Sequence, residues 1–150
     1  MKREIVAGFE VRLDVAYDTG NHMWVEVLDS GRAAVGLDPL IVEANGTLAA
    51  VACVPAGAEI RRGDPFGSLE AEKFVGPLTA PLSGLVTEVN SEVAVQPSLV
   101  DADPYSAWLV EIDPADLDAE SPSLVRGESE IRAWFAAEVE DYRLKGVLAE

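Results

Sequence analysis

Turn-forming residues recur so often between residues 17 and 105 that this part of the chain can hold only short elements. Glycine, proline, asparagine and aspartate interrupt it repeatedly, as in Arg62-Gly63-Asp64-Pro65 and Ser83-Gly84. Short apolar or alternating runs, such as Trp24–Leu28 and Leu48–Val54, lie between these breaks. Many short strands separated by turns are typical of a β sandwich or barrel. The sequence therefore predicts a mainly β fold of short antiparallel strands.

The pattern becomes helical near the C-terminus. From Ser129 to Leu144 the apolar residues recur at the spacing of one helix face, and Gly146 is a stop signal. The residues of this face are Ile131, Trp134, Phe135, Val139 and Tyr142. We expect an amphipathic helix that packs on the β domain; a docking surface for a partner is the alternative.

The length of 150 residues is that of one domain with small additions. We expect residues 1–16 to form an N-terminal extension and residues 17–117 to form the β domain. Residues 118–150 are then a loop followed by the C-terminal helix.

The charge of the chain limits its partners. It carries 27 acidic and 11 basic residues, a net charge of −16, which disfavours nucleic acids and anionic membranes and favours a partner with a basic surface. No apolar stretch has the length of a signal peptide or a membrane span. The sequence therefore predicts a cytoplasmic protein.

The sequence contains few of the residues that usually act as nucleophiles, general bases or metal ligands. Cys53 is the single cysteine, so it cannot form an intramolecular disulfide or a multi-thiolate metal site, and its apolar surroundings predict a buried structural thiol. His22 is the single histidine and has no nucleophile signalled nearby. The sequence has no glycine-rich phosphate loop and no metal-ligand spacing, and we predict no catalytic residue and no metal site.

One lysine stands out by its position. Lys73 separates two strand-like runs within residues 66–81, and Glu70 and Glu72 lie beside it. A surface lysine is ordinarily a solvated charge. A lysine that carries a prosthetic group must instead be exposed to a modifying enzyme and fixed on a rigid element, and a tight turn between paired strands supplies both.

Several short motifs surround this lysine in a characteristic order. They are His22-Met23-Trp24-Val25, Val35-Gly36-Leu37, Gly63-Asp64-Pro65-Phe66-Gly67, Glu70-Ala71-Glu72-Lys73, Pro81-Leu82-Ser83-Gly84, Val86-Thr87-Glu88-Val89-Asn90, Gln96-Pro97-Ser98-Leu99-Val100, Asp103-Pro104-Tyr105 and Trp108-Leu109. In their order and nearly constant spacing these motifs resemble those of the glycine cleavage system H protein family. The resemblance covers about residues 17 to 117.

The resemblance implies a lipoyl domain, a barrel-sandwich hybrid, and covalent attachment of lipoate to Lys73. It implies that a lipoate ligase or lipoyl transferase, and later the partner enzymes, recognise the turn through Glu70, Glu72 and Phe74. His22 and Trp24 are implied as possible contacts of the lipoyl arm. Biotin attachment is disfavoured, because biotin carriers typically flank their lysine with methionines.

By the same resemblance, the chain is a carrier without its own catalytic activity. Its arm would shuttle a covalent intermediate or reducing equivalents between partner enzymes, and in glycine cleavage the cargo is an aminomethyl group. The chain departs from the family pattern at Met23, at Asp38–Glu43, at Glu72 and at Gly76-Pro77.

These departures leave two alternatives open. One is an H-like lipoate-binding protein that carries sulfur or electrons for a heterodisulfide-reductase-like complex in sulfur oxidation. The other is a structural or regulatory module that keeps the fold without the modification.

Overall fold

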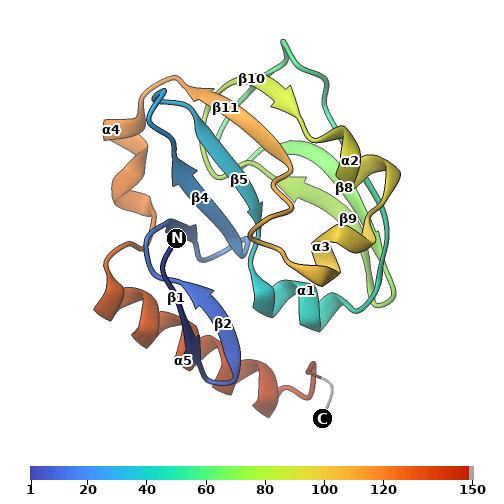
Figure 1. Cartoon of the computed structure of the whole chain (residues 1–150), viewed down its shortest axis with the longest axis vertical. Coiled ribbons are helices and arrows are strands. Elements are labelled where there is room, and N and C mark those ends of the chain that lie inside the picture. The colour runs from blue at the N-terminus through green and yellow to red at the C-terminus, as the bar shows by residue number, and fades with distance from the viewer. Residues whose placement is uncertain (149–150) are drawn as a thin grey trace.

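The computed structural model describes residues 1–148, and its strands form three antiparallel sheets (Figure 1). The largest sheet has six strands in spatial order. They are β3 (Ala16–Asp18), β4 (Met23–Val27), β5 (Ala33–Leu37), β11 (Val110–Pro114), β10 (Gly84–Val89) and β7 (Glu59–Ile60). The mainly β prediction with antiparallel pairing is confirmed.

A three-stranded sheet covers the inner side of the first. In spatial order its strands are β6 (Leu48–Cys53), β8 (Pro65–Ala71) and β9 (Phe74–Thr79). Three short helices border these sheets: α1 (Pro39–Asn45), α2 (Ser91–Val95) and α3 (Ser98–Ala102). One hydrophobic core joins side chains of both sheets, including the fully buried Val35 and Ile112 of the large sheet and Phe66 of the small one.

The N-terminal residues form a β hairpin. Strand β1 (Arg3–Val6) pairs with β2 (Phe9–Arg12), and the hairpin lies along α5 (Glu128–Leu144) (Figure 1). Arg132 of α5 holds Glu4 of β1 with a 2.6 Å bond from Nε. Residues 1–16 therefore fold as one unit with the C-terminal helix.

The predicted C-terminal helix is present and buries its apolar face. Its fully buried side chains, Ile131, Phe135 and Val139, join a second core together with Tyr17 and Trp24. The chain reaches α5 through α4 (Leu117–Glu120) and a 3₁₀ turn (Ser121–Ser123). Packing on the β domain and the hairpin occupies the apolar face of the helix in this chain.

Cys53 is only half-buried, at the end of β6. Burial nevertheless raises the pKa of its thiol to about 11, so the thiol stays protonated at neutral pH. None of the helices described between residues 1 and 148 is long and apolar enough to cross a membrane.

Helix α5 ends in a Schellman motif at the predicted stop signal. Gly146 adopts a φ of 70°. Its N–H donates to the Arg143 carbonyl at 3.1 Å, and the Val147 N–H donates to the Tyr142 carbonyl at 3.1 Å. This is the paired 5→2 and 6→1 bonding by which a residue in the left-handed region closes a helix. The motif turns the chain back so that Val147 lies beside Tyr142.

Gly146→Ala is expected to lower the free energy of unfolding by about 1 kcal/mol, because an alanine is strained at positive φ. A Cβ at this position meets no atom of residues 1–148 within 4 Å, so the loss is conformational and not steric. Gly146→Asn is the control, since asparagine tolerates this region better. Urea denaturation measures both variants. An alanine variant as stable as the wild type, or an asparagine variant less stable than the alanine one, would contradict the argument.

Candidate functional site

Lys73 lies at the tip of a two-residue turn. Ala71 of β8 pairs with Phe74 of β9, so Glu72 and Lys73 are the two central residues. Both are exposed, and the Lys73 ammonium makes no ion pair with any of residues 1–148. Neither residue has a positive φ, so the turn is not of the I′ or II′ type that best fits such a hairpin.

The turn is braced by the segment between α1 and β6. The backbone N–H of Glu72 donates to the Thr47 carbonyl at 3.0 Å, and that of Lys73 donates to the Asn45 carbonyl at 2.9 Å. These bonds connect the tip of the hairpin to a second element, which compensates for the less favourable turn type. The Lys73 side chain therefore extends from a fixed backbone.

Glu72 takes part in the same brace. Its Oε1 accepts a hydrogen bond from the Thr47 N–H at 3.2 Å. The side chain lies directly over Gly46, where a Cβ would approach Glu72 Oε1 to 2.6 Å and the Glu72 Cβ to 2.9 Å. Gly46 also has a φ of 78°. A glycine is needed here both for its backbone conformation and for the space that Glu72 occupies.

Glu70 and Phe74 lie on either side of the turn. Glu70 is exposed on β8, opposite Val75 of β9. Phe74 is 39% exposed, and its ring folds back over Gly76, where a Cβ would lie 2.6 Å from the ring. Gly76 therefore allows the ring to lie along β9 rather than project into solvent.

Two adjoining hollows flank the Lys73 turn. The first, of about 580 Å³, is lined by Lys73 together with Ile41 and Asn45 of α1 and with Tyr142, Lys145 and Val147 at the end of α5. The second, of about 410 Å³, shares Ile41, Asn45 and Tyr142 with the first. Its further lining includes His22, Met23, Leu69, Phe74 and Leu78. Both volumes lie in the range of small-molecule sites.

His22 connects the second hollow to a buried carboxylate. The imidazole Nδ1 lies 2.7 Å from Asp38 Oδ2, and Asp38 is fully buried. On the other side, Nε2 lies 3.8 Å from Glu138 Oε1 of α5, and the ring contacts Tyr142 edge-on at 5.4 Å between centroids. His22 has a φ of 55°, a conformation that histidine tolerates better than most side chains.

These carboxylates set the pKa of His22. Burial disfavours the charged imidazole, but the hydrogen bond to Asp38 and the charges of Asp38, Glu138 and Asp18 outweigh it, so the pKa is raised above its usual value of 6.5. A raised pKa means that protonated His22 stabilises the fold. This contribution is complete below pH 6.5, the ordinary value, and is lost as the pH rises through the raised value.

We therefore expect the wild type to lose stability relative to His22→Asn as the pH rises from about 6 to about 9. Asparagine is chosen because it tolerates the positive φ and has no titratable group. Urea denaturation of both proteins across this range measures the difference in the free energy of unfolding. A difference that is constant, or that grows with pH, would contradict the assignment.

Trp24 does not reach the hollows. It is 1% exposed, it faces Gly36 across the β4–β5 pair, and its indole Nε1 donates to the Pro104 carbonyl at 3.1 Å. A Cβ at Gly36 would lie 2.5 Å from the indole ring. The structure thus brings His22, Phe74 and Lys73 to one site and leaves Trp24 in the core below.

Tyr142, Lys145 and Val147 were not expected at the site. The sequence places Tyr142 on the apolar face of the helix, but it does not show that the end of this helix lies beside the lysine turn. The stop signal at Gly146 is the one feature that bears on it, since it predicts where the chain folds back.

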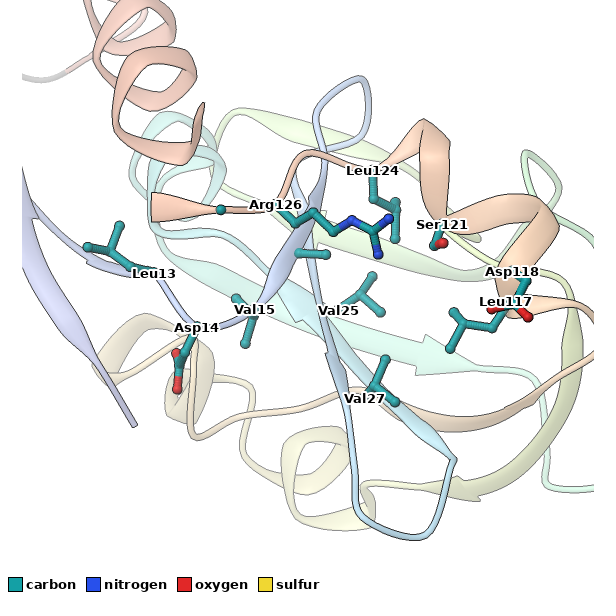
Figure 2. A pocket seen from close by; sticks show the side chains of 12 residues that line it. Leu13, Asp14, Val15, Val25, Val27, Leu117, Asp118, Ser121, Leu124 and Arg126 are labelled. Atoms are coloured by element: carbon teal, nitrogen blue, oxygen red, sulfur yellow. The ribbon is translucent and has the colours of Figure 1, made fainter. Parts of the chain in front are cut away.

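A third hollow, of about 440 Å³, lies away from the lysine turn (Figure 2). Its aliphatic lining includes Val15, Val25 and Leu124, and Figure 2 shows the Arg126 side chain reaching over them. It shares no lining residue with the two hollows beside Lys73. Among residues 1–148, no group of three or more histidine, cysteine or acidic residues is arranged to hold a metal ion.

Comparisons with known proteins agree with this geometry. The family model described as Glycine cleavage H-protein matches residues 15–135. A probable glycine cleavage system H protein of Thermococcus gammatolerans is 36% identical over 113 residues, which are 75% of this chain and 84% of that protein. The glycine cleavage system H protein of Bacillus velezensis is 40% identical over 98 residues, covering 65% and 76% of the two chains.

Among solved structures, a glycine cleavage system H protein from Mycobacterium marinum superposes with a TM-score of 0.65 at 32% identity. The match covers 70% of this chain and 87% of that one. The family match includes the lysine turn and ends within α5, so Tyr142, Lys145 and Val147 lie beyond it.

Proposed function

This chain belongs to the glycine cleavage H-protein family, and on that premise we propose that it is a carrier whose lipoyl group is attached to Lys73. The observation that supports the attachment site is the exposed Lys73 at the tip of a braced hairpin. When bound, the lipoyl group supplies a disulfide that can accept a group or an electron pair and release it again.

The residues around Lys73 fit such a group. Its ammonium has no ion-pair partner among residues 1–148, so acylation leaves no acidic partner unpaired. The adjoining hollows offer apolar surface from Ile41, Phe74 and Tyr142 for an aliphatic chain and its sulfur end. Sulfur next to an aromatic ring is a favourable contact.

Each part of the site then has a task. The hydrogen bonds that the turn N–H groups donate to the Asn45 and Thr47 carbonyls hold its backbone, so the arm moves from a fixed point. Glu70 is free on the outer side of β8 for recognition by a lipoate ligase or lipoyl transferase, while Glu72 holds the turn to the α1–β6 segment. His22 and Phe74 line the surface on which the arm rests between visits to the partner enzymes.

The test is co-expression with a lipoate ligase, followed by intact-mass measurement and peptide mapping. We expect a mass gain of one lipoyl group, located on the peptide that contains Lys73. No gain, or a gain on another residue, would overturn the proposal. Reconstitution of the modified chain with glycine decarboxylase then tests glycine cleavage itself, through glycine-dependent exchange of CO₂.

A second candidate function is also that of a lipoyl carrier, but with different partner enzymes. It is a carrier of sulfur or electrons for a heterodisulfide-reductase-like complex. The observation that favours it is that the chain departs from the family pattern beside the lysine, at Glu72 and at Gly76-Pro77. Modified protein that fails in the glycine-dependent exchange would exclude glycine cleavage and leave this candidate.

A further inference from the structure

His22 joins the β domain to two helices. Its Nδ1 lies 2.7 Å from Asp38 Oδ2 at the start of α1, and its Nε2 lies 3.8 Å from Glu138 Oε1 of α5. Its ring also lies 5.8 Å from the ring of Trp134 and 5.4 Å from that of Tyr142, between centroids. Residues four apart lie on one face of a helix, so Trp134, Glu138 and Tyr142 form one stripe of α5. The buried His22 side chain lies against this stripe.

The end of α5 is held less firmly than its middle. The last fully buried residue of the helix is Val139, and the helical residues after it are exposed or half-buried. The contacts that hold this end include the ring contact of Tyr142 with His22 and a 3.1 Å hydrogen bond from the Arg143 side chain to the Ala7 carbonyl. A segment with few buried contacts opens at a low cost in free energy. The end of α5 is therefore the part of the helix that a local change at His22 can release.

Loss of a proton from His22 changes its contact with α5 and preserves its contact with α1. The imidazolium donates from both ring nitrogens. Because the fully buried Asp38 carboxylate lies at hydrogen-bond distance from Nδ1, the neutral ring keeps its proton there and loses the proton of Nε2. The lone pair of Nε2 then faces the Glu138 carboxylate, so repulsion replaces attraction at this contact.

The other groups around the ring do not replace the lost charge. Asp18 of β3 adds a further negative charge near His22. Burial raises the pKa of the Tyr142 phenol above its usual value of 10, so this side chain is uncharged at neutral and mildly alkaline pH. The indole Nε1 of Trp134 is buried without an acceptor among residues 1–148, which is unfavourable. The contact between α5 and His22 therefore depends on the charge of the imidazolium.

We propose that protonated His22 clamps the end of α5 to the β domain, and that loss of its proton releases this end from beside the Lys73 turn. The Schellman motif at Gly146 links Val147 to Tyr142, and both line the hollow beside Lys73. Release thus changes the surface next to the lysine, while the α1–β6 segment still holds the backbone of the turn. The clamp acts in the unmodified chain and does not depend on the proposed attachment to Lys73.

The test follows the unmodified chain by NMR from about pH 6 to about pH 9, the range in which a histidine with a raised pKa titrates. Long-range ¹H–¹⁵N spectra of the imidazole give its titration and the nitrogen that keeps the proton. The NOE between carbon-bound protons of the His22 and Tyr142 rings reports their proximity, and these protons do not exchange with water. We expect the neutral ring to keep its Nδ1 proton and the NOE to weaken as His22 titrates.

The ¹³C methyl shifts of Val147 measure the ratio of released to docked helix ends. We expect this ratio to rise about tenfold over the titration, an effect between those of exposed and of buried ion pairs. Glu138→Gln removes the carboxylate that faces Nε2, so the Val147 shifts should no longer follow the pH. Glu140→Gln is the matched control, because it removes the same charge from an exposed position of α5 and should keep the wild-type response.

Three results would overturn the inference. They are a ring NOE that stays constant while His22 titrates, a neutral ring that carries its proton on Nε2, and a Glu138→Gln variant that responds to pH as the wild type does. The proposed lipoylation of Lys73 is decided separately by intact mass, so either proposal can fail while the other stands.

Discussion

Lys73→Arg is expected to abolish lipoylation completely, while leaving the fold and its stability within about 0.5 kcal/mol of the wild type. Arginine keeps the positive charge, but its guanidinium is not a nucleophile that a ligase can acylate. The side chain is exposed and makes no ion pair among residues 1–148, so the substitution removes no ion pair. Intact mass after co-expression with a lipoate ligase, together with urea denaturation, measures both quantities.

The chain supplies matched controls, because it has two other lysines, Lys2 and Lys145. Lys2 bonds Glu128 at 2.7 Å and Lys145 bonds Asp141 at 2.8 Å. Lys2→Arg and Lys145→Arg should each retain the full mass gain. If the gain survives in Lys73→Arg and disappears in either control, the acceptor is a different lysine and the hairpin tip is not the attachment site.

Strand content and the C-terminal helix could be predicted from the sequence because both leave a local pattern. The N-terminal hairpin could not. Its turn, Ala7-Gly8, has φ values of 50° and 91°, which are those of a type I′ turn. Alanine is an uncommon first residue in that turn, where asparagine or aspartate is usual. The sequence therefore lacked the signal that would have predicted a hairpin within residues 1–16.

Lys73 could be proposed as the attachment lysine from the order of the motifs. The contacts that hold its turn could not be predicted in this way. The turn is held by backbone bonds to Asn45 and Thr47, and backbone bonds between distant segments leave no side-chain pattern. Trp24 illustrates the opposite case. Its motif suggested an arm contact, yet the missing side chain of Gly36 lets the indole lie flat across the neighbouring strand, inside the core.

Charge and burial at Asp38 predict a large loss of stability when its side chain is removed. Asp38 is fully buried, its Oδ1 accepts the Ile41 N–H at 2.9 Å as the N-cap of α1, and its Oδ2 binds His22. Asp38→Ala removes the cap and leaves a buried imidazole without its partner. We expect the free energy of unfolding to fall by about 3–5 kcal/mol, the usual cost of breaking a buried pair on one side.

Asp38→Asn separates the two contributions, because its amide oxygen can still cap α1 while the charge is lost; we expect an intermediate loss. Asp18→Ala is the matched control, since Asp18 is only partly buried and its carboxylate accepts a bond from the Asn21 side chain. It should cost no more than about 1 kcal/mol. Urea denaturation ranks the three variants. If Asp38→Ala costs no more than Asp18→Ala, the buried pair does not fix α1, and the brace that α1 provides through Asn45 to the Lys73 turn must depend on other contacts.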